Sequence, residues 1–477
     1  MASPSYATPP RPARDSTTLT GSSSDSAASF ISAAGLIARI RAVLADRSDS
    51  RLAQLVAGKV FLVRVASALL ALLSQVLLAR WMGRFEFGVY IYVWTFVLMI
   101  GSLTDVGLGS AARRFIPEYI ELNEHDRLRG FLSGSRWLVI AIAAAIGAAG
   151  VLGVTLARPW LSDYTVVPLY LACAALPVYG LGQLQAGIAQ SYNWPLLALT
   201  PFFLWRQLLL TALVGAIFVV GLETNAIVAM IVAVATSWMV TLGQSWLLNR
   251  RLARDTETGK KRYEPRIWLA TSLPILVVEG FYLLLTYVDI LALEHYRSPD
   301  EVAVYYAAAR ILAVVAFVYF AIAGATTHKF TEYYVAGDHE RLARFFGETI
   351  RWTFWPSLAA CALILSFGHP LLSLFGSGFT SGYTVMFILA VGMLARAAVG
   401  PAERLLNMIG ERKQCAMVYA AAFAVNLGLC ALLIPRLGIE GAATATSVAL
   451  IVESITLYAM TRRRLGHHLF ILRHAEH

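Results

Sequence analysis

An arginine and a glutamine inside one apolar stretch are the first residues of this chain that could do chemistry within a membrane. The stretch from Lys59 to Trp81 is long enough to cross a hydrocarbon core of roughly 30 Å, and Arg64 lies near its start. Gln75 falls on nearly the same helical face, because successive residues turn by about 100°. The pattern predicts one wall of a polar passage. The alternative is an arginine that extends from a helix end to the lipid headgroups.

Three further arginines, Arg206, Arg310 and Arg396, also lie well inside apolar stretches. A charge at the centre of a bilayer costs about 2.5 to 3.5 kcal/mol on insertion scales, so such residues are candidates for function. The cations here outnumber the anions, which favours an anionic cargo, because the guanidinium group binds phosphate oxygens through paired donors. We therefore predict a cationic substrate cavity lined by Arg64, Arg206, Arg310, Arg396 and Gln75.

Three carboxylates are candidates for a gate or for ion coupling. Glu279 lies 215 residues after Arg64, at the offset of an internal repeat, so we expect these two side chains to approach each other when one side of the passage is closed. Two unrelated charges with local partners are the alternative. Glu453 is either held by structural hydrogen bonds or used in proton coupling. Asp289 lies near the end of its stretch, where solvation or helix capping is the commoner role.

The composition indicates an integral membrane protein built of helices. Hydrophobic residues make up 58% of the 477 residues and charged residues 14%, whereas a soluble domain is about 25% charged. The net charge of +10 fits basic loops retained in the cytoplasm and does not imply nucleic acid. The four cysteines lack metal-ligand spacing, so we interpret them as buried apolar side chains and predict no metal site. With no nucleotide-binding loop and only short external loops, the chain is not expected to be an enzyme.

The apolar pattern also predicts the organisation of the chain. Residues 1–29 are expected to be a disordered tail and 30–57 an amphipathic helix on the membrane surface. Two six-helix lobes follow, an N-lobe at 58–250 and a C-lobe at 267–462, joined by a basic linker at 251–266 and followed by a tail at 463–477. The twelve predicted spans are 59–80, 87–109, 136–157, 166–189, 196–220, 226–248, 268–291, 302–324, 353–375, 383–401, 415–434 and 441–461.

An internal repeat relates the two lobes. EFGVY, which contains Glu86, and EVAVY, which contains Glu301, are 215 residues apart, as are Trp137 and Trp352. Six helices per half is an even number, so both halves should cross the membrane in the same direction, related by a pseudo-twofold axis along its normal. Arginine and lysine gather in alternate loops, which predicts that both termini are cytoplasmic.

Two long segments carry a family resemblance. Residues 78–119, LARWMGRFEFGVYIYVWTFVLMIGSLTDVGLGSAARRFIPEY, and residues 434–449, IPRLGIEGAATATSVA, resemble the bacterial polysaccharide biosynthesis flippases of the multidrug, oligosaccharidyl-lipid and polysaccharide exporter superfamily, and LFGSGFTSGY from Leu374 fits as well. The resemblance implies a MATE-like fold in the bacterial inner membrane. It also implies that an undecaprenyl-diphosphate-linked oligosaccharide, a precursor of O-antigen or exopolysaccharide, moves between leaflets by alternating access.

The resemblance further implies coupling to a proton or sodium gradient, with no other cofactor, and a polysaccharide polymerase or export complex as a partner. Two alternatives stay open. A multidrug extruder of the same superfamily would carry organic cations and should keep an acidic lobe. A membrane scaffold of an exopolysaccharide assembly complex would no longer transport.

A cysteine introduced at Thr224, in a background without the native cysteines, is expected to react with an impermeant thiol reagent only from the periplasmic side, because its loop lies opposite the basic loops. A cysteine in the 251–266 linker is the matched control and should react only from the cytoplasm. Labelling of position 224 from the cytoplasm alone would reverse the predicted orientation.

Overall fold

The computed structural model describes residues 49–255 and 259–465. The chain divides into two compact units, Met1–Lys59 and Val60–His477, and the account below concerns the second. The predicted tail at 1–29 lies outside the described residues, as do residues 30–48 of the predicted surface helix and residues 466–477 of the C-terminal tail. Residues 49–57 are helical and continue into the first long helix.

Helices make up the regular structure of the described residues, which contain no strand. The helices of the first half are α2 (Asp49–Met82), α3 (Arg84–Leu103), α4 (Leu108–Glu121), α5 (His125–Ala157), η1 (Arg158–Trp160), α6 (Asp163–Ser191), α7 (Pro195–Thr200), η2 (Pro201–Trp205), α8 (Arg206–Val219) and α9 (Ala226–Asp255). Those of the second half are α10 (Pro265–Tyr296), α11 (Pro299–Leu312), η3 (Ala313–Val315), α12 (Ala316–Val335), α13 (His339–Ser366), α14 (Gly368–Ser373), η4 (Ser377–Gly382), α15 (Tyr383–Ala397), α16 (Ala402–Met408), α17 (Arg412–Leu437) and α18 (Ile439–Leu465).

Eleven helical segments of the described chain are long and apolar enough to cross a membrane, and the predicted all-helical membrane fold is confirmed. The remaining predicted span, 353–375, falls in α13 and α14. Its apolar run is weaker, because Arg351, Trp352 and Pro356 lie within α13 and the helix ends at Ser366. Helices α3 and α4 together form one broken span, Arg84–Glu121, and helices α11 and α12 form another, Pro299–Val335. The two broken spans lie at positions that match the sequence repeat.

The break between α3 and α4 is built by Asp105. Its two carboxylate oxygens accept hydrogen bonds from the backbone N–H groups of Gly107 and Gly109, each at 3.0 Å, which satisfies donors at the start of α4. Gly107 adopts a positive φ of 72°, and a Cβ there would lie 2.7 Å from the carbonyl oxygen of Ser272 in α10. Asp105 therefore acts as a cap at the start of α4.

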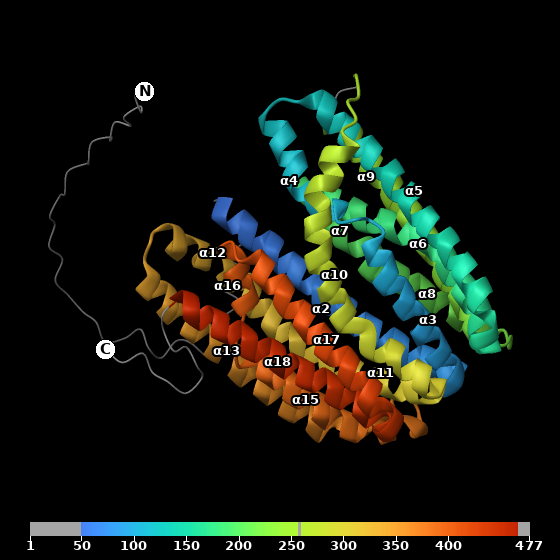
Figure 1. The fold of residues 1–477 in the computed structure, drawn as a ribbon. Coiled ribbons are helices and arrows are strands. Elements are labelled where there is room, and N and C mark those ends of the chain that lie inside the picture. The colour runs from blue at the N-terminus through green and yellow to red at the C-terminus, as the bar shows by residue number, and fades with distance from the viewer. Residues whose placement is uncertain (1–48, 256–258, 466–477) are drawn as a thin grey trace, which may run out of the picture. The chain divides into compact units, whose positions relative to one another are not determined.

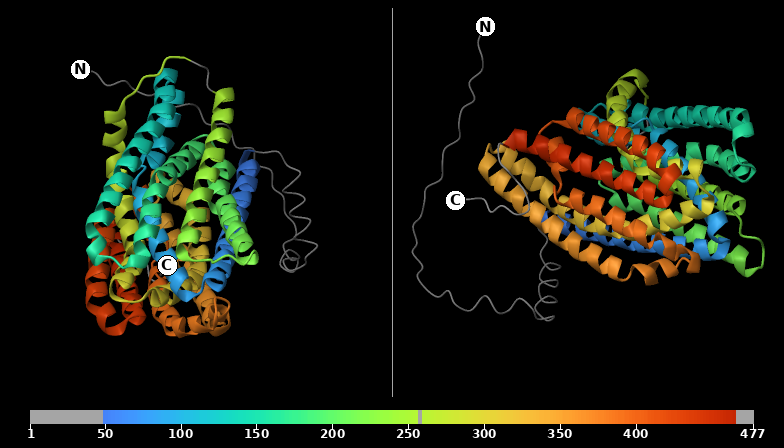
Figure 2. Two further views of the ribbon diagram at one scale, coloured as in Figure 1. Left: turned by 90° about the vertical axis from the view of Figure 1, so that its right-hand side faces the viewer. Right: turned by 60° about the horizontal axis from the view of Figure 1, so that its bottom comes forward.

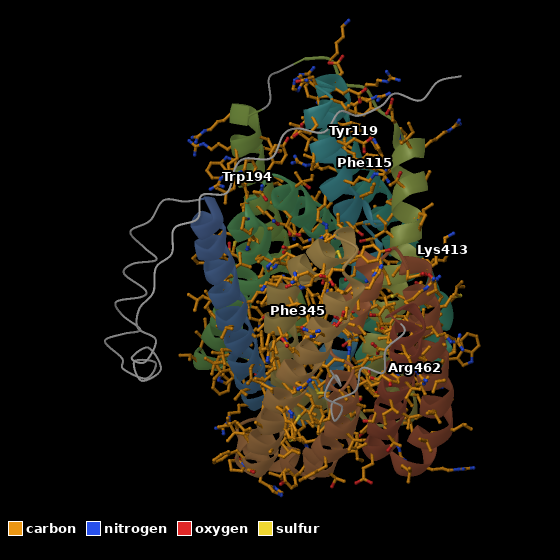
Figure 3. The ribbon with its side chains drawn as sticks, turned by 90° about the vertical axis from the view of Figure 1, so that its left-hand side faces the viewer. Phe115, Tyr119, Trp194, Phe345, Lys413 and Arg462 are labelled. Carbon is orange, nitrogen blue, oxygen red and sulfur yellow. The ribbon has the colours of Figure 1, made fainter. Side chains whose placement is uncertain are left out.

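The helices gather into two lobes. Helices α4, α5, α6 and α9 pack together as lobe 1, and α13, α15, α17 and α18 pack together as lobe 2, with α3 and α11 in contact between them (Figure 1). Figure 2 shows the helices of lobe 2 running side by side. In lobe 1 the rings of Phe115 and Tyr119 on α4 stack 5.7 Å apart (Figure 3).

The connections define two ends of the bundle. We call the end with the α4–α5, α9–α10, α12–α13 and α16–α17 connections the basic end, because arginine and lysine gather in and beside them. The opposite end carries the α2–α3, α5–α6, α10–α11 and α17–α18 connections and the segment α14–η4.

Helix α10 belongs to both lobes. Its first turns lie in lobe 1, where Trp268 is buried and its ring meets Phe131 edge to face at 5.3 Å. Its second half lies in lobe 2, where Tyr282 packs against Tyr419 of α17 at 5.5 Å. The predicted C-lobe, 267–462, contains all but the first two residues of this helix, whereas in the structure its first turns belong to lobe 1.

The contact between α3 and α11 is made backbone against backbone at Gly88. A Cβ on this residue would lie 1.9 Å from the carbonyl oxygen of Pro299, so Gly88→Ala must push the two helices apart. Overpacking of this kind costs about 1 to 3 kcal/mol, and we expect a lower unfolding temperature of the purified protein in detergent. Gly153→Ala, at a helical glycine with open space around it, is the control and should leave that temperature unchanged or raise it. Equal unfolding temperatures for the two variants would contradict the close approach.

Candidate functional site

The two lobes are joined at the opposite end by arginines that bind backbone carbonyl groups. Arg80, at the end of α2, donates through Nε to the carbonyl oxygen of Leu374 at 2.5 Å. Arg84, at the start of α3, donates to the carbonyl oxygen of Gly378 at 3.1 Å and pairs with Asp300 of α11 at 3.2 Å. These contacts hold α2 and α3 against η4 and α11.

Gln75 adds a contact deeper in the bundle. Its Nε2 donates to the hydroxyl of Tyr306 on α11 at 2.6 Å, and the residue is half-buried. The ring of Tyr306 also meets Phe87 of α3 edge to face at 6.3 Å. Gln75 was predicted to line a polar passage, and in this structure it joins α2 to α11.

Arg64 lies on the same helix, about three turns before Gln75. Its side chain is exposed and makes no hydrogen bond or ion pair with any residue whose side chain the structure describes. The five guanidinium donors are therefore available to a ligand.

The predicted gate between Arg64 and Glu279 is not formed in this structure, although the lobes are in contact at the opposite end. Glu279 is exposed, and its Oε1 accepts a hydrogen bond from the hydroxyl of Ser110 on α4 at 2.6 Å. The reason is the path of α10, which lies against lobe 1 at this level and brings Glu279 to α4. The sequence repeat places α10 at the position that α2 has in the first half. It therefore could not predict that α10 follows a different path and brings Glu279 to α4.

Arg113, which lies between the predicted spans 87–109 and 136–157, is a cation near this carboxylate. It donates to the hydroxyl of Ser110 at 2.7 Å and to Oε1 of Gln190 on α6 at 3.2 Å. The chain Arg113–Ser110–Glu279 therefore links α4, α6 and α10. The available signal was the continuing helical pattern of residues 108–119, since α4 extends to Glu121.

Arg206 does not lie where the cationic cavity was predicted. It is buried inside lobe 1, with its guanidinium carbon 4.0 Å from the ring centroid of Trp94 and 5.4 Å from that of Phe202. Its Nε donates to the hydroxyl of Ser237 at 3.0 Å. Aromatic faces stabilise a desolvated cation, so this packing fits a structural role better than a ligand-binding one.

Arg310 differs from Arg206 in having no fixed partner. It is half-buried in the last turn of α11 and makes no hydrogen bond or ion pair within the described part of the chain. Together with Arg64, it is one of the two predicted cavity arginines whose donors stay unused.

Arg396 and Glu453 form an intramembrane ion pair in lobe 2. Nε of Arg396 lies 3.5 Å from Oε1 of Glu453, whose side chain is 1% exposed, against 29% for the arginine. The guanidinium also lies over the rings of Tyr282 and Tyr319, at 5.9 and 5.7 Å from their centroids. The sequence placed these two residues in separate roles, cavity and coupling, and the structure brings them together between α15 and α18.

Asp289 is buried where three helices of lobe 2 meet. Its Oδ2 accepts hydrogen bonds from the hydroxyl groups of Tyr305 on α11, at 2.5 Å, and Thr446 on α18, at 3.2 Å. Its Oδ1 accepts the backbone N–H of Ile290 at 2.8 Å. The carboxylate therefore ties α10 to α11 and α18, a role beyond the solvation or capping expected near a helix end.

Comparison with known proteins gives matches to two family models. The family described as "Polysaccharide biosynthesis protein" matches residues 57–327, more than half of the chain, and MatE matches residues 274–432. The curated proteins gave no match.

Three solved structures illustrate the shared fold. A multidrug resistance MATE family transporter of the MOP superfamily in its inward-facing conformation is 16% identical, with 85% of this chain and 98% of that chain covered and a TM-score of 0.69. The lipid II flippase MurJ in an inward closed conformation is 15% identical, with 84% and 87% covered and a TM-score of 0.66. A MATE family transporter in its outward-facing conformation is 16% identical, with 86% and 96% covered and a TM-score of 0.61.

Removing one partner of the Arg396–Glu453 pair should destabilise lobe 2. Arg396→Ala leaves Glu453 buried without its cation, and we expect the free energy of unfolding to fall by about 3 kcal/mol, measured by denaturation in detergent. The double replacement Arg396→Met with Glu453→Leu should recover most of this loss. Arg404→Ala, at an exposed arginine nearby, is the control and should change stability by less than about 0.5 kcal/mol. A double variant whose loss equals the sum of the two single losses would contradict the pairing.

Proposed function

The chain belongs to the polysaccharide biosynthesis protein family, and from this premise we propose that it is a flippase for undecaprenyl-diphosphate-linked oligosaccharide in the bacterial inner membrane. The observation that carries the proposal is the family match over residues 57–327, on a fold shared with MATE transporters and a lipid II flippase. The expected transport fold is confirmed by these structures, and the cargo is the proposed step.

Two arginines are suited to a diphosphate headgroup. Arg64 and Arg310 have donors that no described residue uses, and they come from α2 and α11, the two helices that the contact between Gln75 and Tyr306 joins, both on the basic-end side of that contact. A bare diphosphate cannot enter hydrocarbon, because desolvating one ion costs on the order of tens of kcal/mol in the Born limit. Guanidinium groups offset this cost through bidentate hydrogen bonds to phosphate oxygens. Arg206 is not proposed as a headgroup ligand, because its guanidinium packs against the rings of Trp94 and Phe202.

We propose that alternating access moves the cargo and that this structure corresponds to the state that faces the basic end, with that end and both termini in the cytoplasm. The contacts of Arg80, Arg84 and Gly88 all lie at the opposite end, which supports closure there. The higher TM-score to the inward-facing MATE structure than to the outward-facing one agrees with this assignment, at 0.69 against 0.61.

The proposed energy source is a proton or sodium gradient. Asp289 is the better placed of the coupling candidates, because binding or loss of a cation at its carboxylate would change its hydrogen bonds to Tyr305 and Thr446 and so the packing of three helices. Glu453 is paired with Arg396, and Glu279 is exposed. A polysaccharide polymerase or export complex is the partner proposed to receive the flipped repeat unit.

The MatE match over residues 274–432 favours a second candidate, a multidrug extruder. Such a transporter would bind organic cations, and unpaired arginines at positions 64 and 310 disfavour them. The third possibility, a scaffold without transport, predicts that polymer secretion continues when these arginines are neutralised together.

Transport can be tested with purified protein in liposomes that contain a fluorescent polyprenyl-diphosphate sugar, with dithionite bleaching to report the exposed leaflet. Arg64→Ala and Arg310→Ala should each slow translocation by about tenfold or more, because each removes charge-assisted hydrogen bonds to phosphate. Arg158→Ala, at an exposed arginine of η1 at the opposite end, is the matched control and should translocate at the wild-type rate.

Proton and sodium gradients imposed in turn on the same liposomes identify the coupling ion. Movement of a fluorescent organic cation without movement of the lipid-linked sugar would replace the proposal with the extruder. Equal translocation by wild type and by the Arg64→Ala and Arg310→Ala variants would remove these arginines from the pathway.

A further inference from the structure

A second basic site lies within lobe 1, apart from Arg64 and Arg310. A cavity of about 600 Å³ opens between α5, α6 and α9 at the basic end and is closed on one side by residues 259–261 of the linker. Its cations are Arg129, Arg136 and Lys261, and its neutral polar groups include Ser133 and Asn249. None of the described side chains that line it is acidic.

Arg136 is the central group of this cavity. One guanidinium nitrogen, Nη1, donates to Oδ1 of Asn249, whereas Nε and Nη2 are buried and have no hydrogen-bond partner among the described residues. Leaving a charged donor buried and unsatisfied costs more free energy than leaving a neutral group unsatisfied. Two unpartnered donors of one guanidinium match two oxygens of a phosphate, and because both are buried, the Arg136 side chain must reorient to present them to the cavity.

Lys261 supplies a second positive charge at the mouth of the cavity. The side chain is exposed, and its Nζ lies 3.4 Å from the hydroxyl of Ser133, a long hydrogen bond that a phosphate oxygen could replace. Arg129 already binds Asp126 and the carbonyl oxygen of Lys260. It therefore adds to the positive electrostatic potential of the cavity but is not a free donor.

The depth of the cavity indicates where its ligand comes from. Arg136 is the first residue of the predicted span 136–157, and the next residue, Trp137, lines the cavity and is 72% exposed. On α9, Trp246 is 59% exposed, with Arg250 over its ring at 5.2 Å. Exposed tryptophan is typical of the level of the lipid headgroups, and basic pockets between membrane helices bind anionic headgroups.

We propose that this cavity binds the phosphate group of an anionic phospholipid from the leaflet at the basic end. The phosphate lies between Arg136 of α5 and Lys261 of the linker, and the acyl chains leave past Trp137 into the bilayer. The site is separate from the proposed cargo pathway, and its existence does not depend on the identity of the cargo.

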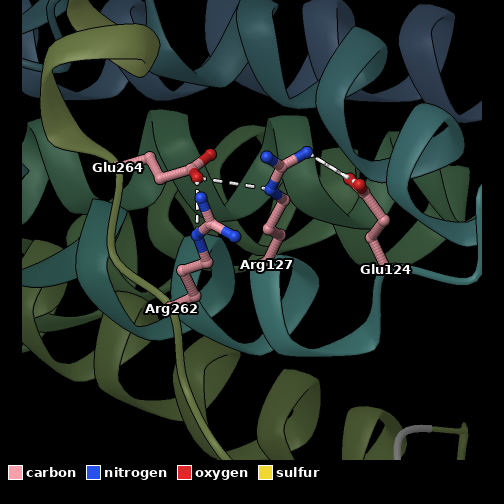
Figure 4. Close-up of polar contacts among 4 residues, drawn as sticks. All are labelled: Glu124, Arg127, Arg262 and Glu264. Carbon is pink, nitrogen blue, oxygen red and sulfur yellow. Dashed lines mark hydrogen bonds and ion pairs between the residues drawn. The ribbon is translucent and has the colours of Figure 1, made fainter.

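The linker is already attached to lobe 1 beside this cavity. Arg127 of α5 pairs with Glu124 at 2.7 Å and with Glu264 at 3.2 Å, and Arg262 pairs with Glu264 at 2.8 Å (Figure 4). The backbone N–H of Arg262 donates to the carbonyl oxygen of Asp126 at 2.9 Å. A bound phosphate would add one more contact between α5 and the linker. It would thereby restrict the movement of the linker that leads into α10.

The test uses the full chain purified in a neutral detergent, with phosphatidylglycerol, phosphatidylcholine or inorganic phosphate added. Phosphatidylglycerol should raise the unfolding temperature and remain bound in native mass spectrometry, and the other two should not. Lys261→Gln, at an exposed linker position, should weaken phosphatidylglycerol binding by about tenfold, and Arg136→Gln by at least as much.

Arg250→Gln, at an exposed arginine of the same end outside the cavity, is the matched control and should bind phosphatidylglycerol like wild type. Wild-type affinity in the Lys261→Gln variant would overturn the site. Equal stabilisation by inorganic phosphate and by phosphatidylglycerol would overturn the lipid as its ligand.

Discussion

Helix α10 is buried in both lobes, and this shared burial constrains every movement of one lobe against the other. Trp268 is fixed in lobe 1 against Phe131, and Asp289 is fixed in lobe 2 by Tyr305 and Thr446. A rigid helix between two such anchors would lock the lobes together. Pro274 and Gly280 lie between the anchors, and these are residue types at which helices bend. The lobes can therefore change their angle only as this segment bends or as one anchor loosens.

The charges inside the bundle divide into those that the protein neutralises and those that it leaves open. Arg206 is covered by aromatic rings, and Arg396 is paired with Glu453 beneath two tyrosines. Each of these arginines stabilises contacts between helices of a single lobe. Among the described residues, Arg64 and Arg310 have no such cover, and the same residue type is therefore free to serve a ligand. Burial and neighbours, and not residue type, decide which arginines could meet a cargo.

Much of the architecture was predictable, because apolar length and the 215-residue repeat are properties of the sequence alone. Eleven of the twelve predicted spans and the connections at the basic end follow from them, whereas the breaks within Arg84–Glu121 and Pro299–Val335 were not predicted. The pairing of Glu279 was not predictable, because the two repeats have diverged in the path of one helix: α10 reaches lobe 1 and delivers Glu279 to Ser110. Arg206 and Trp94 lie far apart in the chain, so their stacking is a tertiary contact that no local pattern encodes.

Arg80 and Arg84 reach carbonyl groups of the main chain at Leu374 and Gly378. A carbonyl oxygen is present whatever side chain its residue carries, so most substitutions at position 374 leave its acceptor in place. Gly378 is the exception, because a Cβ there would lie 2.5 Å from Nη1 of Arg84. Substitutions elsewhere in this segment are thus compatible with unchanged contacts to Arg80 and Arg84 as long as one glycine and the two arginines persist.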